Sequence, residues 1–198
     1  MNKHGHAVSS RLEVAAAAYA DRACVGVRPN DGQGFAPLQE GDLAAFYRQF
    51  LRVRAEPLFI DIFKPIPYQS ATQFAEYFAV DKRPLWLMGR PASPTAYFGL
   101  HYMLRQHDLA NLDFTYFSAY PSPGSEAAQS FWRYVHGCIV ERGLTRVQSF
   151  VIDSSVEKTR LLESFGFRKE GVLREHYFHN GKLHDVMVHA WMADERHV

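Results

Sequence analysis

The stretch that decides the fold is LLESFGFRKEG, residues 161–171, in which an apolar helical segment stops at a glycine and a charged, strand-like segment follows at once. Gly166 has no Cβ, so it adopts the left-handed backbone conformation that ends many helices without steric cost. We therefore predict that a short helix ends at Gly166 and that the chain returns to the core at Phe167.

The residues before this stretch predict where that helix begins. Ser154 and Glu157 have the spacing of a capping box, in which the side chains satisfy free backbone N–H groups of the first turn. The face expected to pack into the core consists of Lys158, Leu161, Leu162 and Phe165.

The neighbouring segments predict a crossover unit followed by a hairpin. Apolar residues recur at helical spacing from Ser125, and Gly143 marks the end of that helix. Residues 144–152 read as a strand, which should run parallel to the strand before the long helix through a right-handed connection. Beyond the opening stretch, apolar and polar residues alternate on both sides of Asn180-Gly181, which favours a two-residue hairpin.

The first half of the domain predicts two helices and an antiparallel meander. The helices are expected at about residues 41–55 and 70–80, with Ser70 as the N-cap of the second. The meander is expected from three short runs rich in aromatic residues, at about 84–89, 96–104 and 112–119.

Composition limits the class of protein. The chain has 198 residues, of which 47% are hydrophobic, enough for one domain at 34–198 behind an N-terminal tail at 1–33. The 22 Lys and Arg residues nearly balance the 21 Asp and Glu residues, so no nucleic-acid partner is expected. No segment reads as a membrane span or signal peptide. Cys24 and Cys138 lack metal-ligand spacing, which predicts reduced thiols and a cytoplasmic location.

With these elements the chain resembles the GCN5-related N-acetyltransferases (GNAT), in particular the branch of ribosomal-protein alanine and spermidine acetyltransferases. The order strand, short helix, L-x-x-x-G-F-x-x-E-G, charged strand and F-x-N-G across 146–192 is similar to that branch, as are APLQEGDL (36–43) and PIPYQSATQFAEYF (65–78). The resemblance covers about residues 33–195. It implies the GNAT fold, an α/β (α+β) domain whose mixed, mostly antiparallel twisted sheet has splayed parallel strands 4 and 5 and helices on both faces.

The resemblance also implies a reaction. Acetyl-CoA would donate an acetyl group to a primary amine of a small molecule or of a protein N-terminus, with no metal and no membrane partner. Such a transfer needs a base for the ammonium proton, donors for the oxyanion and an acid for the departing thiolate. Two alternatives stay open, namely a donor carried on the phosphopantetheine of a carrier protein and a non-catalytic binding domain. A homodimer is also left open.

Residues of the donor site follow from the same resemblance. The fourth strand would pair its backbone with the pantetheine arm, and the next loop and helix N-terminus would hold the pyrophosphate. The loop here is YPSPGSEAAQ, in which Ser122 and Ser125 replace the usual Arg or Gln and the first Gly. Leu162 replaces a tyrosine that donates a proton, which fits either a solvent-supplied proton or inactivity. The implied donor-binding residues are Tyr116, Phe117, Ser118, Ala119, Ser122, Gly124, Ser125, Glu126, Ala127, Ser155, Lys158 and Leu162.

Three residues are candidates for the catalytic base, each with a structural alternative. Asp113 lies where the family often holds a carboxylate, or else it caps the turn in DLANLD. Glu175 would face the acceptor cleft, or else it is structural. His176 would lie opposite Asp185 across the hairpin, as an oriented base or as a cross-strand structural pair.

Overall fold

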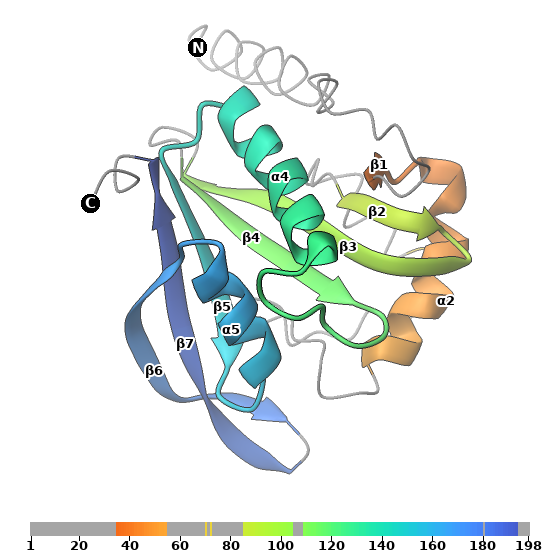
Figure 1. Cartoon of the computed structure of the whole chain (residues 1–198). Coiled ribbons are helices and arrows are strands. Elements are labelled where there is room, and N and C mark those ends of the chain that lie inside the picture. The colour runs from red at the N-terminus through yellow and green to blue at the C-terminus, as the bar shows by residue number, and fades with distance from the viewer. Residues whose placement is uncertain are drawn as a thin grey trace, which may run out of the picture.

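The structure is a computed structural model that describes residues 35–54, 70, 72, 85–104, 109–179 and 181–193. The described residues build a seven-stranded sheet with the order β1-β2-β3-β4-β5-β7-β6 (Figure 1). All neighbours are antiparallel except β4 and β5, which are parallel, so the predicted mixed, mostly antiparallel sheet is confirmed. The strands are β1 (Phe35–Pro37), β2 (Leu85–Arg90), β3 (Ser93–Leu104), β4 (Leu109–Tyr116), β5 (Arg146–Ile152), β6 (Arg168–His179) and β7 (Lys182–Met192).

Helices cover both faces of the sheet, as predicted. Helices α4 (Glu126–Glu141) and α5 (Val156–Ser164) lie on one face, and η1 (Glu40–Asp42) and α2 (Leu43–Arg54) belong to the other (Figure 1). Each face has its own aromatic core. Phe98 stacks on Trp86 beneath α4, with ring centroids 4.8 Å apart. On the α2 side, Phe46 meets Tyr97 edge to face at 5.8 Å.

The end of α5 confirms the prediction made from Gly166. This glycine has a φ of +87°, and its N–H group donates to the Glu163 carbonyl at 3.0 Å. The Phe167 N–H group donates to the Leu162 carbonyl at 3.1 Å, which completes a Schellman motif. The Phe167 side chain is only 2% exposed, so the chain does return to the core there.

The start of α5 corrects the predicted capping box. The N-cap is Ser155, and its side chain makes no capping hydrogen bond. The Ser155 N–H group donates to the Ile152 carbonyl at 3.0 Å, while its own carbonyl accepts from Thr159. The tight turn after β5 thus brings Ser155, one residue beyond Ser154, to the first turn of the helix.

The meander is confirmed, but with different strand ends. The strand expected at 112–119 is β4, which begins at Leu109 and ends at Tyr116. Residues 93–95, which precede the strand expected at 96–104, open β3, where Pro94 pairs with Gly89 at a register shift. A proline is tolerated at such a strand start.

Several predictions lie outside the described residues. These are the tail at 1–33, the second helix except for Ser70 and Thr72, and Asn180. The division at residue 34 stays a prediction. The hairpin itself is confirmed, because His179 pairs with Lys182 and Gly181 has a φ of +80°.

The cysteine prediction is wrong. Cys138, 1% exposed on α4, is disulfide-bonded, whereas two reduced thiols were expected. Cys24, the other cysteine of the chain, lies outside the described residues.

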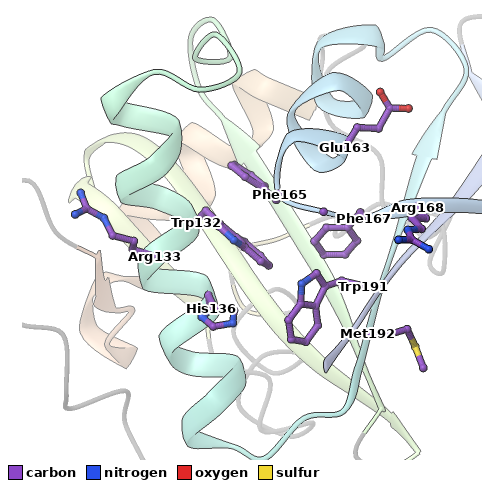
Figure 2. A pocket seen from close by; sticks show the side chains of 10 residues that line it. Trp132, Arg133, His136, Glu163, Phe165, Phe167, Arg168, Trp191 and Met192 are labelled. Carbon is purple, nitrogen blue, oxygen red and sulfur yellow. The ribbon is translucent and has the colours of Figure 1, made fainter. Parts of the chain in front are cut away.

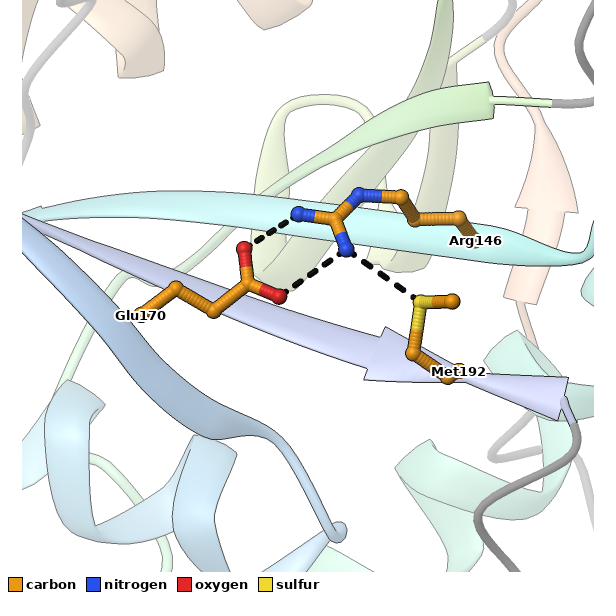
Figure 3. Close-up of polar contacts among 3 residues, drawn as sticks. All are labelled: Arg146, Glu170 and Met192. Carbon is orange, nitrogen blue, oxygen red and sulfur yellow. Dashed lines mark hydrogen bonds and ion pairs between the residues drawn. The ribbon is translucent and has the colours of Figure 1, made fainter.

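One exposed ion pair ties three strands at the rim of the sheet. Arg146 on β5 donates to both carboxylate oxygens of Glu170 on β6 and contacts Met192 Sδ of the intervening β7 at 3.2 Å (Figure 3). The Arg146 guanidinium lowers the pKa of Glu170. Since both side chains are partly solvated, we expect a stabilisation of at most about 1 kcal/mol.

None of the described helices is long and apolar enough to cross a membrane.

Candidate active site

The candidate site lies where β4 and β5 part. The two strands pair over three residues each, Leu109–Asn111 with Arg146–Gln148. Beyond Asn111, β4 continues to Tyr116 with β3 on its other edge, and β5 continues to Ile152 beside β7. In the described part of the chain, the facing edges of β4 and β5 therefore have no strand partner there. An extended ligand can hydrogen-bond to such an edge as an added strand does.

A buried lysine reaches into this gap. The Lys158 ammonium on α5 lies 3.6 Å from Asp113 Oδ1 and 4.7 Å from the centroid of the Phe114 ring. Phe114 packs in the core beneath α4 and α5, whereas Asp113 accepts a hydrogen bond at 3.2 Å from the Tyr97 hydroxyl, which belongs to the α2 side. Because adjacent strand residues face opposite sides of a sheet, Lys158 must pass between β4 and β5 to reach Asp113.

Burial controls the charge of this lysine. Its side chain is 8% exposed, and burial lowers the pKa of the ammonium. The Asp113 carboxylate favours the charged form but reverses only part of that change. Lys158 is therefore neutral more often than an ordinary solvated lysine.

The position of Asp113 excludes one of its two predicted roles. It lies inside β4 opposite Gly99, so the predicted alternative of a turn cap is wrong. β4 begins at Leu109, four residues before Asp113. The role of Asp113 as a base stays a prediction.

Sequence reasoning missed the side chains of two tyrosines at the end of β4. Tyr116 and Tyr120 pack against each other with ring centroids 5.4 Å apart, and Tyr120 also contacts Phe114. Burial raises the pKa of both hydroxyls, so they stay protonated at neutral pH. The Tyr116 hydroxyl has no hydrogen-bond partner among the described residues, and the Tyr120 hydroxyl, beside Thr115, has none of ordinary geometry. The available signal was YFSAY (116–120), in which residues 116–119 were interpreted as strand backbone and Tyr120 as the start of the donor loop.

The predicted donor backbone at 116–119 is only partly available. The Phe117 N–H group donates to the Thr95 carbonyl of β3 at 2.9 Å, so it does not face the gap, and this part of the prediction is wrong. Its ring packs with Phe46 on the α2 side. Ser118 and Ala119 are exposed beyond the end of the strand.

The donor loop leads into α4 through a turn that uses its own side chains. The Ser125 N–H group donates to the Ser122 carbonyl at 3.1 Å, and Gly124 has a φ of +78°. Ser125 is the N-cap of α4, and its hydroxyl accepts from the Ala128 N–H group at 3.3 Å. One N–H group that an anion would use is thus already satisfied. Glu126 adds a carboxylate to the first turn, which already favours negative charge.

Besides Lys158, the other two implied donor-binding positions at α5 are also buried. Leu162 is 0% exposed and belongs to the core beneath α4, as an apolar packing residue would. Ser155 is 5% exposed and begins the helix. Ser155, Lys158 and Leu162 stay predictions as donor-binding residues.

The predicted one-to-one pair of His176 and Asp185 is wrong. The register shifts between Leu173 and Tyr177, so three residues of β6, 174–176, lie opposite the single Asp185. Asp185 Oδ1 accepts from the Glu175 backbone N–H group at 2.8 Å, and Glu175 has a φ of +48°. A bulge with positive φ turns the strand away from simple alternation, which the sequence pattern assumed.

Glu175 and His176 are exposed and remain predictions as catalytic residues. In the part of the chain that the structure describes, neither forms a hydrogen bond or ion pair with Asp113 or Lys158. The bulge does lie at the splayed end of the sheet, because the Asp153 N–H group, just after β5, donates to the Asp185 carbonyl at 3.0 Å.

The described residues contain no group of three or more His, Cys, Asp or Glu side chains that could hold a metal ion. His184, which is 5% exposed, hydrogen-bonds through Nδ1 to Asp153 Oδ1 at 2.8 Å. That hydrogen bond lowers the pKa of Asp153.

Solved structures share this architecture. Ribosomal-protein-S5-alanine acetyltransferase from Vibrio fischeri superposes with a TM-score of 0.64 at 13% identity, over 81% of this chain and 93% of that one. The chain has the GNAT fold. The yncA protein from Salmonella typhimurium, solved with its cofactor acetyl-CoA, has a TM-score of 0.64 at 12% identity, over 83% of this chain and 96% of that one. Dodecameric spermidine N-acetyltransferase from Vibrio cholerae has a TM-score of 0.63 at 18% identity, over 82% and 95%.

Sequence comparison with this GNAT-fold chain gives a shorter match. The uncharacterized N-acetyltransferase YoaA of Bacillus subtilis is 40% identical over 48 residues, which are 24% of this chain. The chain covers about a quarter of that relative, 27% of its length. No family model matches the chain.

A cavity of about 610 Å³ lies elsewhere in the GNAT fold. It is open on one side and is lined by residues of α4, the end of α5, the start of β6 and the end of β7, with Trp132, Phe165 and Trp191 in its walls (Figure 2). Trp191 pairs with Val147 at the start of β5, where β4 and β5 are still joined. The cavity is therefore at the closed end of the sheet and is separate from the candidate active site.

Proposed function

We propose that the chain is an acyl-CoA-dependent N-acetyltransferase that transfers an acetyl group to a primary amine of a small molecule or of a protein N-terminus. The observation that carries this proposal is the unpaired edge of β4, the strand that also carries the half-buried Asp113 carboxylate. The GNAT fold and the short match to an N-acetyltransferase support it.

The residues of the gap fit the pantetheine arm of such a donor. An extended arm would hydrogen-bond along β4 beyond Asn111, where the strand lacks a partner. Asp113 would accept the proton of the attacking ammonium, and the Tyr97 hydroxyl would orient its carboxylate. The amine nitrogen then bonds to the thioester carbon, the carbon–sulfur bond breaks and the thiolate takes up a proton. Leu162 cannot donate this proton, and burial raises the pKa of Tyr120, which makes its hydroxyl a weak acid, so the proton would come from solvent.

The nucleotide half of coenzyme A fits less well. Ser125 already satisfies an N–H group at the start of α4, and Glu126 would repel a pyrophosphate there. This observation favours a second candidate, an acyltransferase that takes its donor from the phosphopantetheine of a carrier protein. The adenosine end is absent from that donor.

The test incubates the chain with acetyl-CoA and each of a panel of primary amines, and measures the release of free thiol. The same assay is repeated with acetylated carrier protein as the donor. Asp113→Asn is expected to lower kcat/KM by about a hundredfold or more, because a positioned base contributes roughly 10² to 10⁴. The exposed Glu141→Gln is the matched control and is expected to keep the parent rate. The non-catalytic alternative would be favoured if neither donor releases thiol and if neither donor shifts the Tm of the chain when it is added. If Glu175→Gln or His176→Gln lowers kcat/KM by about a hundredfold and Asp113→Asn does not, the base lies on β6 and not at Asp113.

A cytoplasmic location and self-association remain predictions. The spermidine N-acetyltransferase of similar fold is dodecameric. Light scattering of the purified chain measures its mass in solution directly, and a monomer at all concentrations would exclude the homodimer.

A further inference from the structure

The gap between β4 and β5 contains a primary amine that belongs to the chain itself. Lys158 Nζ lies 3.6 Å from Asp113 Oδ1. Asp113 is two residues beyond Asn111, the last residue of β4 that pairs with β5. A donor arm that adds to the free edge of β4 must end at this closed corner of the gap. Its acyl carbon would then arrive beside Lys158.

We propose that Lys158 is an internal acyl acceptor, which the protein acetylates with its own bound donor. This inference rests on the proposed function. Its basis is that Lys158 Nζ contacts the same carboxylate that would deprotonate an external amine, and that Tyr97 holds that carboxylate from the other side. An external amine would share this carboxylate, whose side chain is 27% exposed, with Lys158.

The chemistry of the step balances without another reactant. Lys158 gives its proton to Asp113, and the neutral nitrogen attacks the thioester carbon. A C–N bond forms, the C–S bond breaks, and the nitrogen loses its second proton. The thiolate takes up that proton and leaves as free thiol, while Asp113 returns the first proton to solvent. Burial already favours the neutral amine, since it lowers the pKa of Lys158.

The product would block the gap. Acetyl-lysine has no positive charge, so the ion pair with Asp113 is lost, while the added acetyl group occupies the corner where a donor would place its own. Because an amide does not transfer its acyl group onward, a modified chain is expected to lose thiol release with external amines. Self-acetylation would therefore limit the number of turnovers when acceptor is scarce.

The experiment incubates the full chain with acetyl-CoA, or with S-acetylpantetheine, in the absence of acceptor, and maps acetylated lysines by mass spectrometry over time. Lys158 is expected to be acetylated at least about tenfold faster than the exposed Lys169 and Lys182, although it is the least accessible of the three. Asp113→Asn is expected to slow only the Lys158 reaction, by about a hundredfold. Lys169→Arg is the matched control and should leave Lys158 acetylation unchanged.

The outcomes separate this inference from the proposed function. Thiol release with an external amine while Lys158 is acetylated no faster than Lys169 and Lys182 would overturn the inference and leave the proposed function intact. If neither donor supports transfer to an external amine and neither acetylates Lys158, the inference and the proposed function are both overturned. The selectivity measurement uses the unaltered chain, so it does not depend on whether Asp113→Asn folds.

Discussion

At the scale of single residues, Gly166 shows how a backbone conformation fixes the fold. Gly166→Ala is expected to destabilise the chain by about 1 kcal/mol or more, because its φ of +87° is unfavourable for any residue with a Cβ. The added Cβ would meet Trp191 Cδ1 at 3.8 Å, an ordinary contact, so the cost is one of conformation. Urea unfolding measures the change. The control is Gly171→Ala, whose Cβ meets nothing and whose φ is not positive. An equal effect in both variants would contradict the cap.

A second residue, His189, makes stability depend on pH. It is 0% exposed on β7, and neither ring nitrogen has a hydrogen-bond partner among the described residues. Burial lowers its pKa below 6.5, Glu163 opposes this change and Lys169 adds to it. Between that lowered pKa and about pH 6.5 the unfolded chain binds more protons than the folded chain. The contribution of His189 to the free energy of unfolding is therefore complete above about pH 6.5 and is lost as the pH falls below it. We expect His189→Leu to flatten this dependence in urea titrations, and the exposed His176→Gln to leave it unchanged. A parent slope retained in His189→Leu would assign it to another group.

At the scale of elements, the N-terminus of α4 sets how much the nucleotide half of a donor can contribute. We expect acetyl-CoA and acetyl-phosphopantetheine to bind with affinities within about tenfold, a difference under roughly 1.4 kcal/mol. Glu126→Gln should strengthen acetyl-CoA binding and leave the shorter donor unchanged, because only the former places a pyrophosphate near that carboxylate. Calorimetric titration of both donors against both proteins measures this. A hundredfold preference of the parent chain for acetyl-CoA would show that the loop binds phosphate normally.

The elements were largely predictable from the sequence, because each carries a local signal. Helical spacing located α4, and the glycines at 143 and 166, with φ of +63° and +87°, ended α4 and α5 as predicted. The residue pairs of the site were less predictable. Because β6 has a bulge, the Asp185 carboxylate accepts a hydrogen bond from the Glu175 backbone N–H group and does not pair with the His176 side chain. The alternation of apolar and polar residues does not reveal a bulge. The contact of Lys158 with Asp113 depends on the gap between two strands far apart in sequence, which no local pattern encodes.

At the scale of the whole molecule, the sheet consists of two halves, one with β1, β2, β3 and β4 and the other with β5, β7 and β6. Three residue pairs join them, Leu109–Asn111 with Arg146–Gln148. Few backbone hydrogen bonds thus cross the middle of the protein, and the two halves are expected to open before either unfolds. A bound donor would supply the missing hydrogen bonds and stabilise the closed form in proportion to its concentration over its Kd. Native-state amide exchange should therefore slow on addition of acetyl-CoA across residues 112–116, and change little in the β2–β3 hairpin. Equal slowing in both regions would mean that the sheet opens as a single cooperative unit.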